Sequence, residues 1–287
     1  MAGIDAGWFR AAVDTFIASP ENTLRNEAND PAWGRPLIGF SSGADPLYGF
    51  YQRDIGAFFR LPADFMEAAY PGEGFEPSGL TVVSWVLPHT DLTKEAHRRE
   101  SAWPSERWAR ARIMGEEANM KLRNRLVAAL AAEGARAVSP MHSPLFKSQM
   151  SEKYLYASTW SERHAAYAAG LGTFGLSDGL ITAVGKAHRV GSIIVDAALP
   201  PTPRPYTDHH AFCLCYANGT CGACIAKCPA GAITANGHDK RRCSDYVDRT
   251  RAYVEEHYHF KGYGCGFCQV GVPCESRIPE GIDVKVS

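Results

Sequence analysis

Apolar residues recur at helical spacing in three segments of the chain. Residues 5–18 (DAGWFRAAVDTFIA) and 161–169 (SERHAAYAA) show this spacing over short lengths. In the longest segment, residues 105–133, Ser105 is a suitable N-cap and Gly134 is a suitable residue to follow the last turn. The pattern therefore predicts three helices, of which the one at 105–133 is amphipathic and the longest.

Short apolar runs between these segments predict β-strands. The run LTVVSWVLP at 80–88 is rich in β-branched residues and is bounded by Gly79 and Pro88, which is typical of a buried strand. Three further strands are expected at RAVSP (136–140), GLITAV (179–184) and GSIIVDAAL (191–199). Because strands and helices alternate over roughly residues 30–200, an α/β layer structure is expected there.

The stretch LPPTPRPY at 199–206 marks a predicted domain boundary. It holds four prolines, as a rigid linker does. All nine cysteines lie beyond it, between Cys213 and Cys274. We therefore expect two domains, an α/β (α+β) domain at 1–203 and a cysteine-rich domain at 204–287.

Composition and charge exclude some classes of protein. The hydrophobic fraction of 45% and the charged fraction of 21% are typical of a folded globular chain. A net charge of −1 gives no overall attraction to nucleic acid or to an anionic membrane. The N-terminus lacks the features of a signal peptide, and no apolar stretch approaches membrane-spanning length. We therefore expect a cytoplasmic protein without a membrane partner, in which thiols stay reduced.

A basic run lies along the predicted 105–133 helix. Its members are Arg107, Arg110, Arg112, Lys121, Arg123 and Arg125. Since Glu116 and Glu117 interrupt the run, it predicts a solvated helix face, with a nucleic-acid surface as the alternative.

The cysteines predict metal clusters rather than disulfides. Their odd number and their confinement to the last quarter of the chain argue against a disulfide framework. Cys221-x2-Cys224-x3-Cys228, followed by Pro229, reproduces the last three cysteines and the proline of the two-cluster ferredoxin run, in which the last cysteine serves the other cluster. This crossed pattern predicts a bacterial ferredoxin-like domain with two [4Fe-4S] clusters. The expected ligands are Cys215, Cys221, Cys224 and Cys274 for one cluster, and Cys228, Cys243, Cys265 and Cys268 for the other.

Two assignments stay open within this cysteine set. Eight thiolates are needed and nine are present, so either Cys213 or Cys215 is spare. Cys215 is preferred as the ligand, because its five-residue gap to Cys221 equals the gap between Cys268 and Cys274. A zinc ribbon built from the two C-x2-C pairs is the alternative to clusters, but it leaves five cysteines unexplained.

The segment Gly170-Leu171-Gly172-Thr173-Phe174-Gly175 matches the letters of the G-x-G-x-x-G dinucleotide fingerprint. That fingerprint needs a strand before it and a helix after it. Here a predicted helix precedes it and a predicted strand follows, so a nucleotide-binding Rossmann interpretation is rejected. The glycines then either form a tight helix-to-strand turn or let a flat cofactor approach bare backbone.

The order of these segments resembles the epoxyqueuosine reductase family, which is similar in turn to the corrinoid-dependent reductive dehalogenases. The resemblance covers about residues 80–275 and rests on SERHAAYAAGLGTFGLSDGLIT, GSIIVDAALPP, the cysteine run, RRC and GCGFCQ. It implies a corrinoid-binding reductase type of N-terminal domain that holds base-off cobalamin. It also implies that residues 170–175 lie beside the corrinoid, as cofactor-binding residues, and that two [4Fe-4S] clusters supply it with electrons.

The chain departs from this family's pattern at the expected proton donor. In the reductases that act on tRNA, an aspartate stands six residues before the Glu-Arg pair, and counting back from Glu162 gives Tyr156. Reductive dehalogenases use a tyrosine, and a phenol with its usual pKa of about 10 keeps its proton at neutral pH. Tyr156 is therefore the candidate proton donor, with a packed aromatic as the alternative. Together with Glu275 in place of a proline after the last cysteine, this departure argues against epoxyqueuosine as the substrate.

Two functions follow from these features. The first is a reductase in which two clusters pass single electrons to cobalamin, which reduces a small organic substrate or a modified nucleoside. The second is an electron-transfer protein that delivers low-potential electrons to a corrinoid or another redox partner, without substrate chemistry of its own. The expected partners are a small-molecule substrate and a ferredoxin- or flavodoxin-type donor. A tRNA ranks below them, because the net charge is −1.

Overall fold

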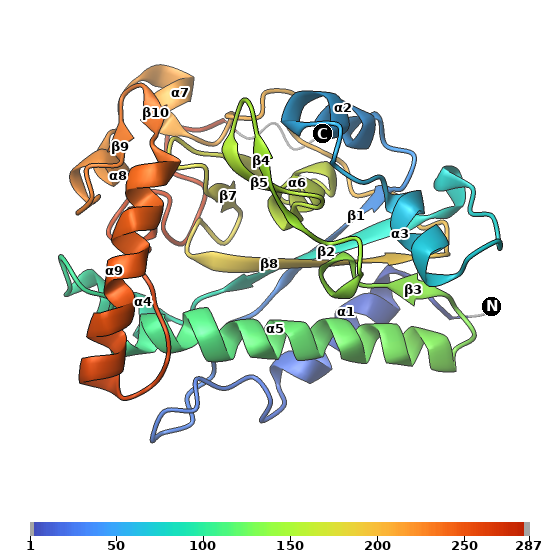
Figure 1. Cartoon of the computed structure of the whole chain (residues 1–287), viewed down its shortest axis with the longest axis horizontal. Coiled ribbons are helices and arrows are strands. Elements are labelled where there is room, and N and C mark those ends of the chain that lie inside the picture. Colours follow the sequence, from blue (N-terminus) through green and yellow to red (C-terminus); the bar gives the residue numbers. More distant parts are fainter. Residues whose placement is uncertain (1–2, 284–287) are drawn as a thin grey trace.

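A four-stranded antiparallel sheet forms the centre of the protein, in a computed structural model that describes residues 3–283 (Figure 1). The strand order is β1-β2-β8-β3. The bounds of these strands are Leu37–Ser42 for β1, Thr81–Pro88 for β2, His188–Val195 for β8 and Ala137–Val138 for β3. The expected strands are confirmed, although β8 begins at His188 and not at Gly191, and it ends at Val195.

Strand β2 occupies the middle of this sheet. It pairs with β8 along its whole length, from Thr81 opposite Val195 to Pro88 opposite His188, and it pairs with β1 on its other edge. All of its residues are buried. A strand covered on both faces needs apolar residues at nearly every position, which explains why the sequence shows a continuous apolar run there.

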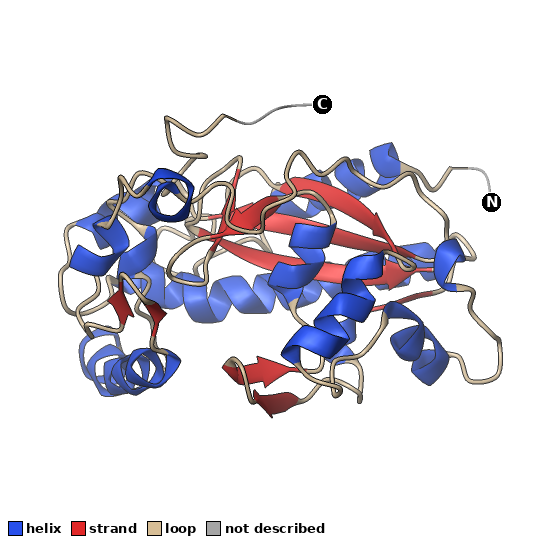
Figure 2. Ribbon diagram, turned by 90° about the horizontal axis from the view of Figure 1, so that it is seen from above, coloured by secondary structure: helices blue, strands red, loops and turns tan. Residues whose placement is uncertain are grey.

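Helices cover both faces of the sheet, so the domain has three layers (Figures 1 and 2). The long helix α5 (Glu106–Ala132) and helix α1 (Ala6–Ile17) lie on one face. Helices α2 (Pro46–Ile55), α3 (Pro62–Ala69) and α6 (Glu162–Ala168) lie on the other. This antiparallel sheet with helices on both sides is a mixed α/β fold, as expected.

The side chains of β2 divide the apolar core into two parts. Val83, Trp85 and Leu87 pack with α1 and α5, whereas Val82 and Val86 pack with α2, α3 and α6. Because successive side chains of a strand point to opposite faces, one run of apolar residues supplies both parts.

Helix α5 begins and ends where its sequence predicts. The side chain of Ser105 accepts a hydrogen bond from the Trp108 N–H, which caps the first turn. After the last turn, Gly134 adopts a φ of 78°, a left-handed conformation that favours glycine.

The basic residues of α5 do not form a uniformly solvated face. Arg123 is 1% exposed and bonds both Glu116 and Glu162, at 3.2 and 3.1 Å. The prediction of a solvated face is therefore wrong at Arg123, because two carboxylates from separate elements hold this guanidinium inside the protein. Of the other basic residues of this helix, Arg107 pairs with Asp30, Arg110 with Glu106, and Lys121 and Arg125 with Glu21.

Several shorter elements complete the domain that contains the sheet. The hairpin of β4 (Ser148–Ser151) and β5 (Leu155–Ser158) projects from the body of the domain (Figure 2). Helix α4 spans Asp91–Arg98, β6 spans Gly172–Phe174 and pairs with β7 at Leu180–Thr182, and single 3-10 turns lie at Pro77–Gly79 and Pro140–His142.

The cysteine-rich segment packs at one end of the sheet (Figure 1). It consists of α7 (Leu214–Asn218), α8 (Ala223–Ala226), a pair of short strands β9 (Ile233–Thr234) and β10 (Gly237–His238), α9 (Lys240–Tyr258) and a 3-10 turn at Phe267–Gln269. Apolar packing is continuous from the sheet domain into this segment, since Leu176 and Ile181 belong to the same buried cluster as Cys213, Cys224 and Cys274. Across the part of the chain that is described, no helix has the length and apolarity to cross a membrane.

Candidate functional site

The nine cysteines divide into two groups, and each group lines its own cavity. The first cavity is lined by Cys213, Cys215, Cys221, Cys224 and Cys274, together with Lys186 and apolar residues. The second cavity, of about 240 Å³, is lined by Cys228, Cys243, Cys265 and Cys268, together with residues of α5 and α9. The structure thus brings together the two sets of thiols that the crossed ferredoxin pattern groups.

The grouping of these thiols argues against a zinc ribbon built from the two C-x2-C pairs. Among residues 3–283, no three His, Cys, Asp or Glu side chains lie close enough to hold one metal ion. A [4Fe-4S] cluster instead needs four thiolates around a larger core. The zinc ribbon alternative would combine the pair Cys221 and Cys224 with the pair Cys265 and Cys268, and these pairs line different cavities.

Local structure explains how the second group converges. Cys243 lies in the first turn of α9, whose N-cap Asp239 accepts hydrogen bonds from two backbone N–H groups of that turn. Between Cys265 and Cys268, Gly266 has a φ of 81°, and a Cβ there would lie 2.2 Å from the ring of Trp108. Only glycine therefore allows this loop to rest against α5.

Burial keeps several of these thiols protonated when no metal is bound. Burial raises the pKa of Cys224 and of Cys243 to about 11, and that of Cys265 to about 12. Since metal ligands are thiolates, cluster assembly must release protons from these buried groups.

The two cysteines that compete for the first cavity differ in burial. Cys213 is the N-cap residue of α7 and is 8% exposed, like Cys224 at 8% and Cys274 at 9%. Cys215 lies in the first turn of α7 and is only partly buried. The N–H of Phe212 donates a hydrogen bond of 2.8 Å to the Thr173 hydroxyl, which fixes the backbone directly before Cys213.

A lysine and a serine join the two cavities. The buried side chain of Lys186 lines the first cavity, and its Nζ donates a hydrogen bond of 3.2 Å to the hydroxyl of Ser177, which lines the second. Burial alone would lower the pKa of Lys186, but the neighbouring thiols, Cys274 foremost, raise it above its ordinary value. Sequence reasoning missed both residues, because nothing in AVGKAH or GLSDG distinguishes them from other polar loop positions.

The three glycines of the 170–175 segment face the protein's own atoms. A Cβ at Gly170, whose φ is 75°, would lie 2.6 Å from the carbonyl oxygen of Pro203. A Cβ at Gly172 would lie 2.2 Å from the carbonyl oxygen of Ile181, and one at Gly175 would lie 3.1 Å from the side chain of Ile181. The backbone faces freed by these glycines are therefore filled by the chain itself.

The other residues of this segment are also occupied by internal contacts. Leu171 is buried, and the Thr173 hydroxyl accepts the bond from the Phe212 N–H. The carbonyl oxygen of Phe174 lies 2.8 Å from Nδ1 of His210, and its N–H donates to the carbonyl of His209 at 2.7 Å. This geometry favours the helix-to-strand turn over cofactor contact as the reason for the glycines, and it ties the turn to the residues that lead into the first cysteine.

Tyr156 lies on the projecting β4–β5 hairpin with its side chain exposed. It is 47% exposed, and its cross-strand partner Met150 is 59% exposed. The neighbouring aromatics are packed instead, since the Tyr154 hydroxyl donates a bond of 2.6 Å to Asp54 and Trp160 is 1% exposed. Tyr154 and Trp160 are therefore packed aromatic side chains, whereas Tyr156 is not.

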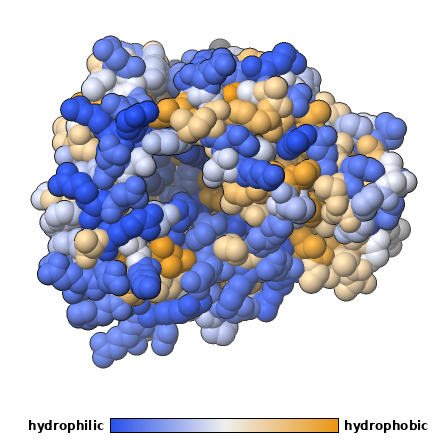
Figure 3. All heavy atoms as spheres, viewed as in Figure 1, coloured by the Kyte–Doolittle hydropathy of each residue, from blue (hydrophilic) through white to orange (hydrophobic). Residues whose placement is uncertain are grey.

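A hollow in the surface lies between α9 and the hairpin, above β8 (Figure 3). Arg112 and Arg189, from α5 and β8, belong to the lining of the second cavity. The Nε of Arg189 lies 2.6 Å from Glu116, and His238 on the same cavity lies 3.1 Å from Asp178. Polar side chains from three elements thus line the second cavity beside its cysteines.

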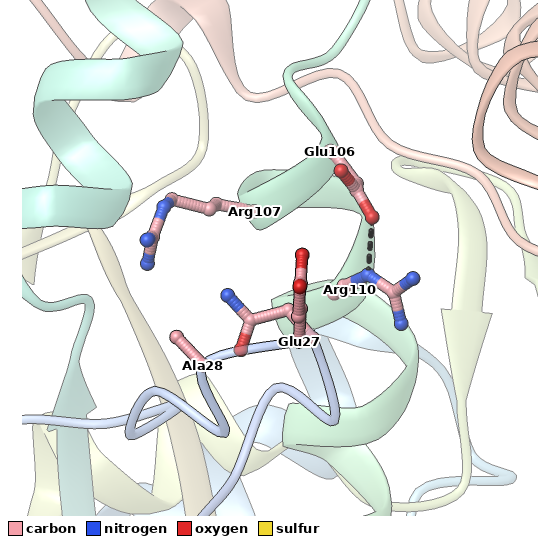
Figure 4. A pocket seen from close by; sticks show the side chains of 6 residues that line it. Glu27, Ala28, Glu106, Arg107 and Arg110 are labelled. Carbon is pink, nitrogen blue, oxygen red and sulfur yellow. Dashed lines mark hydrogen bonds and ion pairs between the residues drawn. The ribbon is translucent and has the colours of Figure 1, made fainter.

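A larger pocket of about 650 Å³ lies beside the start of α5 (Figure 4). Its lining includes Glu27, Glu106 and Arg110 but no cysteine. Two of its charged groups, Arg110 and Glu106, pair with each other at 2.7 Å. Because no cysteine lines this pocket, we do not consider it the redox site despite its size.

Known proteins are similar to this chain in two respects. Residues 217–273 match the family described as a 4Fe-4S double cluster binding domain. The epoxyqueuosine reductase of Bacillus anthracis is 31% identical over 119 residues, which cover 39% of this chain and 29% of that protein. The epoxyqueuosine reductase of Aliivibrio fischeri is 35% identical over 119 residues, or 39% of this chain and 30% of that protein.

A solved reductive dehalogenase shares the fold. It is 16% identical, with a TM-score of 0.52 over 87% of this chain and 32% of that one. The matched stretch spans less than a third of the curated relatives' length. The domain match supports two iron–sulfur clusters as cofactors. These similarities confirm the expected resemblance: the chain is similar to epoxyqueuosine reductases over 119 residues, and residues 217–273 match a 4Fe-4S double cluster binding domain.

Proposed function

We propose that this protein is an iron–sulfur reductase whose two [4Fe-4S] clusters pass single electrons to a cobalamin, for the reduction of a small organic substrate or a modified nucleoside. The observation that carries the proposal is the pair of separate cysteine-lined cavities, joined by the contact of Lys186 with Ser177. Two one-electron carriers in adjacent cavities can pass electrons in series. The likeness to enzymes named epoxyqueuosine reductase supports a reductive reaction.

The ligand sets follow the two cavities. Cys228, Cys243, Cys265 and Cys268 would hold the second cluster, and Cys221, Cys224 and Cys274 would contribute three ligands to the first. For its fourth ligand, equal gaps in the sequence favour Cys215, whereas burial favours Cys213. Cys224 and Cys274 are as buried as Cys213, whereas Cys215 is only partly buried. We therefore infer that Cys213 is the fourth ligand.

Cobalamin enters the proposal from the relatives. The reductive dehalogenase that shares the fold is described in terms of B12-dependent dehalogenation. When bound, a reduced cobalamin would supply a strongly reducing centre for the substrate. Residues 170–175 remain candidates only for positioning, since their backbone faces are filled. Met150 and Tyr156, which are exposed and lie opposite each other on the hairpin, are the side chains that we propose would face the macrocycle.

Tyr156 is the proposed proton donor. Its phenol reaches solvent from a hairpin that is held by the bond of Tyr154 to Asp54 and by Lys240, whose Nζ lies 5.2 Å from the centre of the Tyr154 ring. These contacts fix the hairpin against α9 while leaving the hydroxyl of Tyr156 free to meet a substrate. The substrate itself is proposed only as a class, because the departures from the family pattern argue against epoxyqueuosine.

Anaerobic purification tests the cofactors directly. We expect about eight iron atoms and as many sulfides per chain. We also expect stoichiometric binding of added cobalamin with the absorption spectrum of its base-off form. Four or fewer iron atoms, or zinc in their place, would overturn the cluster assignment.

An electron-transfer protein without substrate chemistry is the second candidate. The internal packing of residues 170–175 favours it, because it removes the cofactor contact that the family resemblance implies there. A full iron content without any affinity for cobalamin would select this function. A tRNA substrate ranks below both, since most basic side chains of α5 are paired with carboxylates.

A further inference from the structure

Lys186 is a buried cation without a carboxylate partner among the described residues. Its side chain is 3% exposed, and within residues 3–283 its Nζ has one oxygen partner, the hydroxyl of Ser177. Burying an ammonium group is strongly unfavourable unless negative charge lies nearby. The surroundings of Lys186 must therefore supply that charge from groups other than carboxylates.

The cysteine groups, once they hold the proposed clusters, supply negative charge within reach of Lys186. Lys186 lines the first cavity together with Cys213, Cys224 and Cys274, and its partner Ser177 lines the second cavity with Cys268. A four-thiolate iron–sulfur cluster carries a net negative charge, which grows when the cluster takes up an electron. The ammonium group thus lies at the border between two centres whose charge changes during electron transfer.

The backbone fixes Lys186 in this place. Its N–H donates to the carbonyl oxygen of Cys274 at 2.8 Å, next to a proposed cluster ligand. Gly185 before it has a φ of 83°, and a Cβ there would lie 2.2 Å from the carbonyl oxygen of Glu275. The stem of Lys186 also rests on Gly179, where a Cβ would lie 2.8 Å from Cδ. Gly185 therefore lets the backbone before Lys186 approach the loop after Cys274, and Gly179 makes room for the Lys186 side chain.

We propose that the positive charge of Lys186 raises the reduction potentials of both clusters, and that it raises the potential of the first cluster more than that of the second. The inference rests on the proposed pair of clusters. A fixed positive charge in a site of low dielectric stabilises the reduced form of each cluster, because that form carries one more negative charge. The effect is larger at the first cavity, which Lys186 lines, than at the second, which it reaches through Ser177.

A second buried lysine offers a matched control. Lys94 is 6% exposed and donates to the hydroxyl of Ser276, so it touches the same loop two residues after Cys274. It differs in forming a salt bridge of 2.8 Å with Asp91 and in lining neither cavity. Its charge is therefore balanced locally, and its removal is expected to leave the clusters' potentials unchanged.

The test is a redox titration of the full chain, purified anaerobically with its clusters and followed by electron paramagnetic resonance. Lys186→Met keeps much of the side-chain volume and removes the charge. We expect it to retain the iron of the wild type and to shift both midpoint potentials to more negative values, with the larger shift at the first cluster. Lys94→Met should show the wild-type potentials.

The outcomes separate this inference from the proposed function. A wild-type protein without two clusters would overturn the proposed function itself. Two clusters whose potentials are the same in the wild type and in Lys186→Met would overturn only the role of Lys186. If Lys186→Met loses iron, Lys186→Gln decides, because it removes the charge and keeps a group that can donate a hydrogen bond in the same place. We expect Lys186→Gln to lower both potentials, and unchanged potentials in that variant would overturn the inference.

Discussion

The guanidinium of Arg98 binds both carboxylate oxygens of Glu275. Its Nε lies 3.0 Å from each oxygen, and its Nη2 lies 2.7 Å from Oε1. Glu275 also accepts the N–H of Gly271 and follows Cys274, where the family pattern has a proline. An ion pair to α4 thus anchors the loop that carries the last two cysteines, in place of a rigid residue.

Replacing Glu275 with glutamine should loosen this loop. Loss of a charged, largely buried acceptor is expected to lower the free energy of unfolding by about 1–3 kcal/mol, measured by chemical denaturation. Although burial opposes them, Arg98 and the Gly271 N–H lower the pKa of Glu275. A lowered carboxyl pKa stabilises the fold at neutral pH, and this contribution is lost as the pH falls below the ordinary carboxyl range. The difference between the wild type and Glu275→Gln should therefore shrink on acidification, and a constant difference would contradict this account.

Arg123→Met should be strongly destabilising, because it leaves Glu162 buried without its cation. The expected loss is about 3–5 kcal/mol at neutral pH, as for other buried pairs broken on one side. Burial raises the pKa of Glu162 above its ordinary value even with Arg123 present. Protonation of Glu162 at lower pH should therefore reduce the damage caused by the substitution, which chemical denaturation across a pH series measures.

Arg125→Met is the control for that experiment. Arg125 lies on the same helix and pairs with Glu21, but its side chain is 51% exposed. Its removal should change the free energy of unfolding by less than about 1 kcal/mol. If both variants lost the same free energy of unfolding, the buried ion pairs of Arg123 would contribute no more to stability than an exposed pair does.

Separate replacements of Cys213 and Cys215 by alanine should distinguish the two candidate ligands. We expect Cys213→Ala to lose about four iron atoms per chain, because one cluster lacks a ligand, while Cys215→Ala keeps about eight. Iron and sulfide analysis after anaerobic reconstitution measures this. The reverse result would restore the ligand that the equal sequence gaps favour.

Gly172→Ala tests whether the 170–175 segment serves packing. The added Cβ would lie 2.2 Å from the carbonyl oxygen of Ile181, so we expect a loss of about 2–3 kcal/mol in unfolding free energy. Gly79→Ala is a suitable control, since a Cβ at Gly79 would have no neighbouring atom within 4 Å and the φ of Gly79 is not in the left-handed region. A variant of normal stability that fails only to bind cobalamin would instead support cofactor contact at Gly172.

The parts of this fold that depend on local pattern could be predicted from the sequence. The run at 80–88 predicted β2 because a strand buried on both faces must be apolar throughout, and Ser105 and Gly134 bounded α5 through capping that involves neighbouring residues. The solvated state expected for Arg123 was wrong because its partner Glu162 lies on another helix. The burial of Lys186 could not be predicted either, because it depends on contacts with the loop at Cys274, which is distant in the sequence.

Tyr156→Phe is the substitution that isolates the proposed proton donor. It removes only a hydroxyl from an exposed side chain, so the fold, the iron content and cobalamin binding should stay as in the wild type. If the phenol delivers the proton, the rate of substrate reduction should fall by about 100-fold or more, in line with the loss of general acid catalysis. Single-turnover oxidation of the pre-reduced protein by a candidate substrate measures this rate.

Tyr216→Phe supplies the matched control, because Tyr216 is 46% exposed and lies on a different element, α7. It should leave the rate unchanged. An unchanged rate in Tyr156→Phe as well would remove Tyr156 from the mechanism. Equal losses of rate in both variants would indicate a general effect of surface tyrosines on electron entry. That result would also contradict a specific role of the hairpin, where Tyr156 lies opposite Met150.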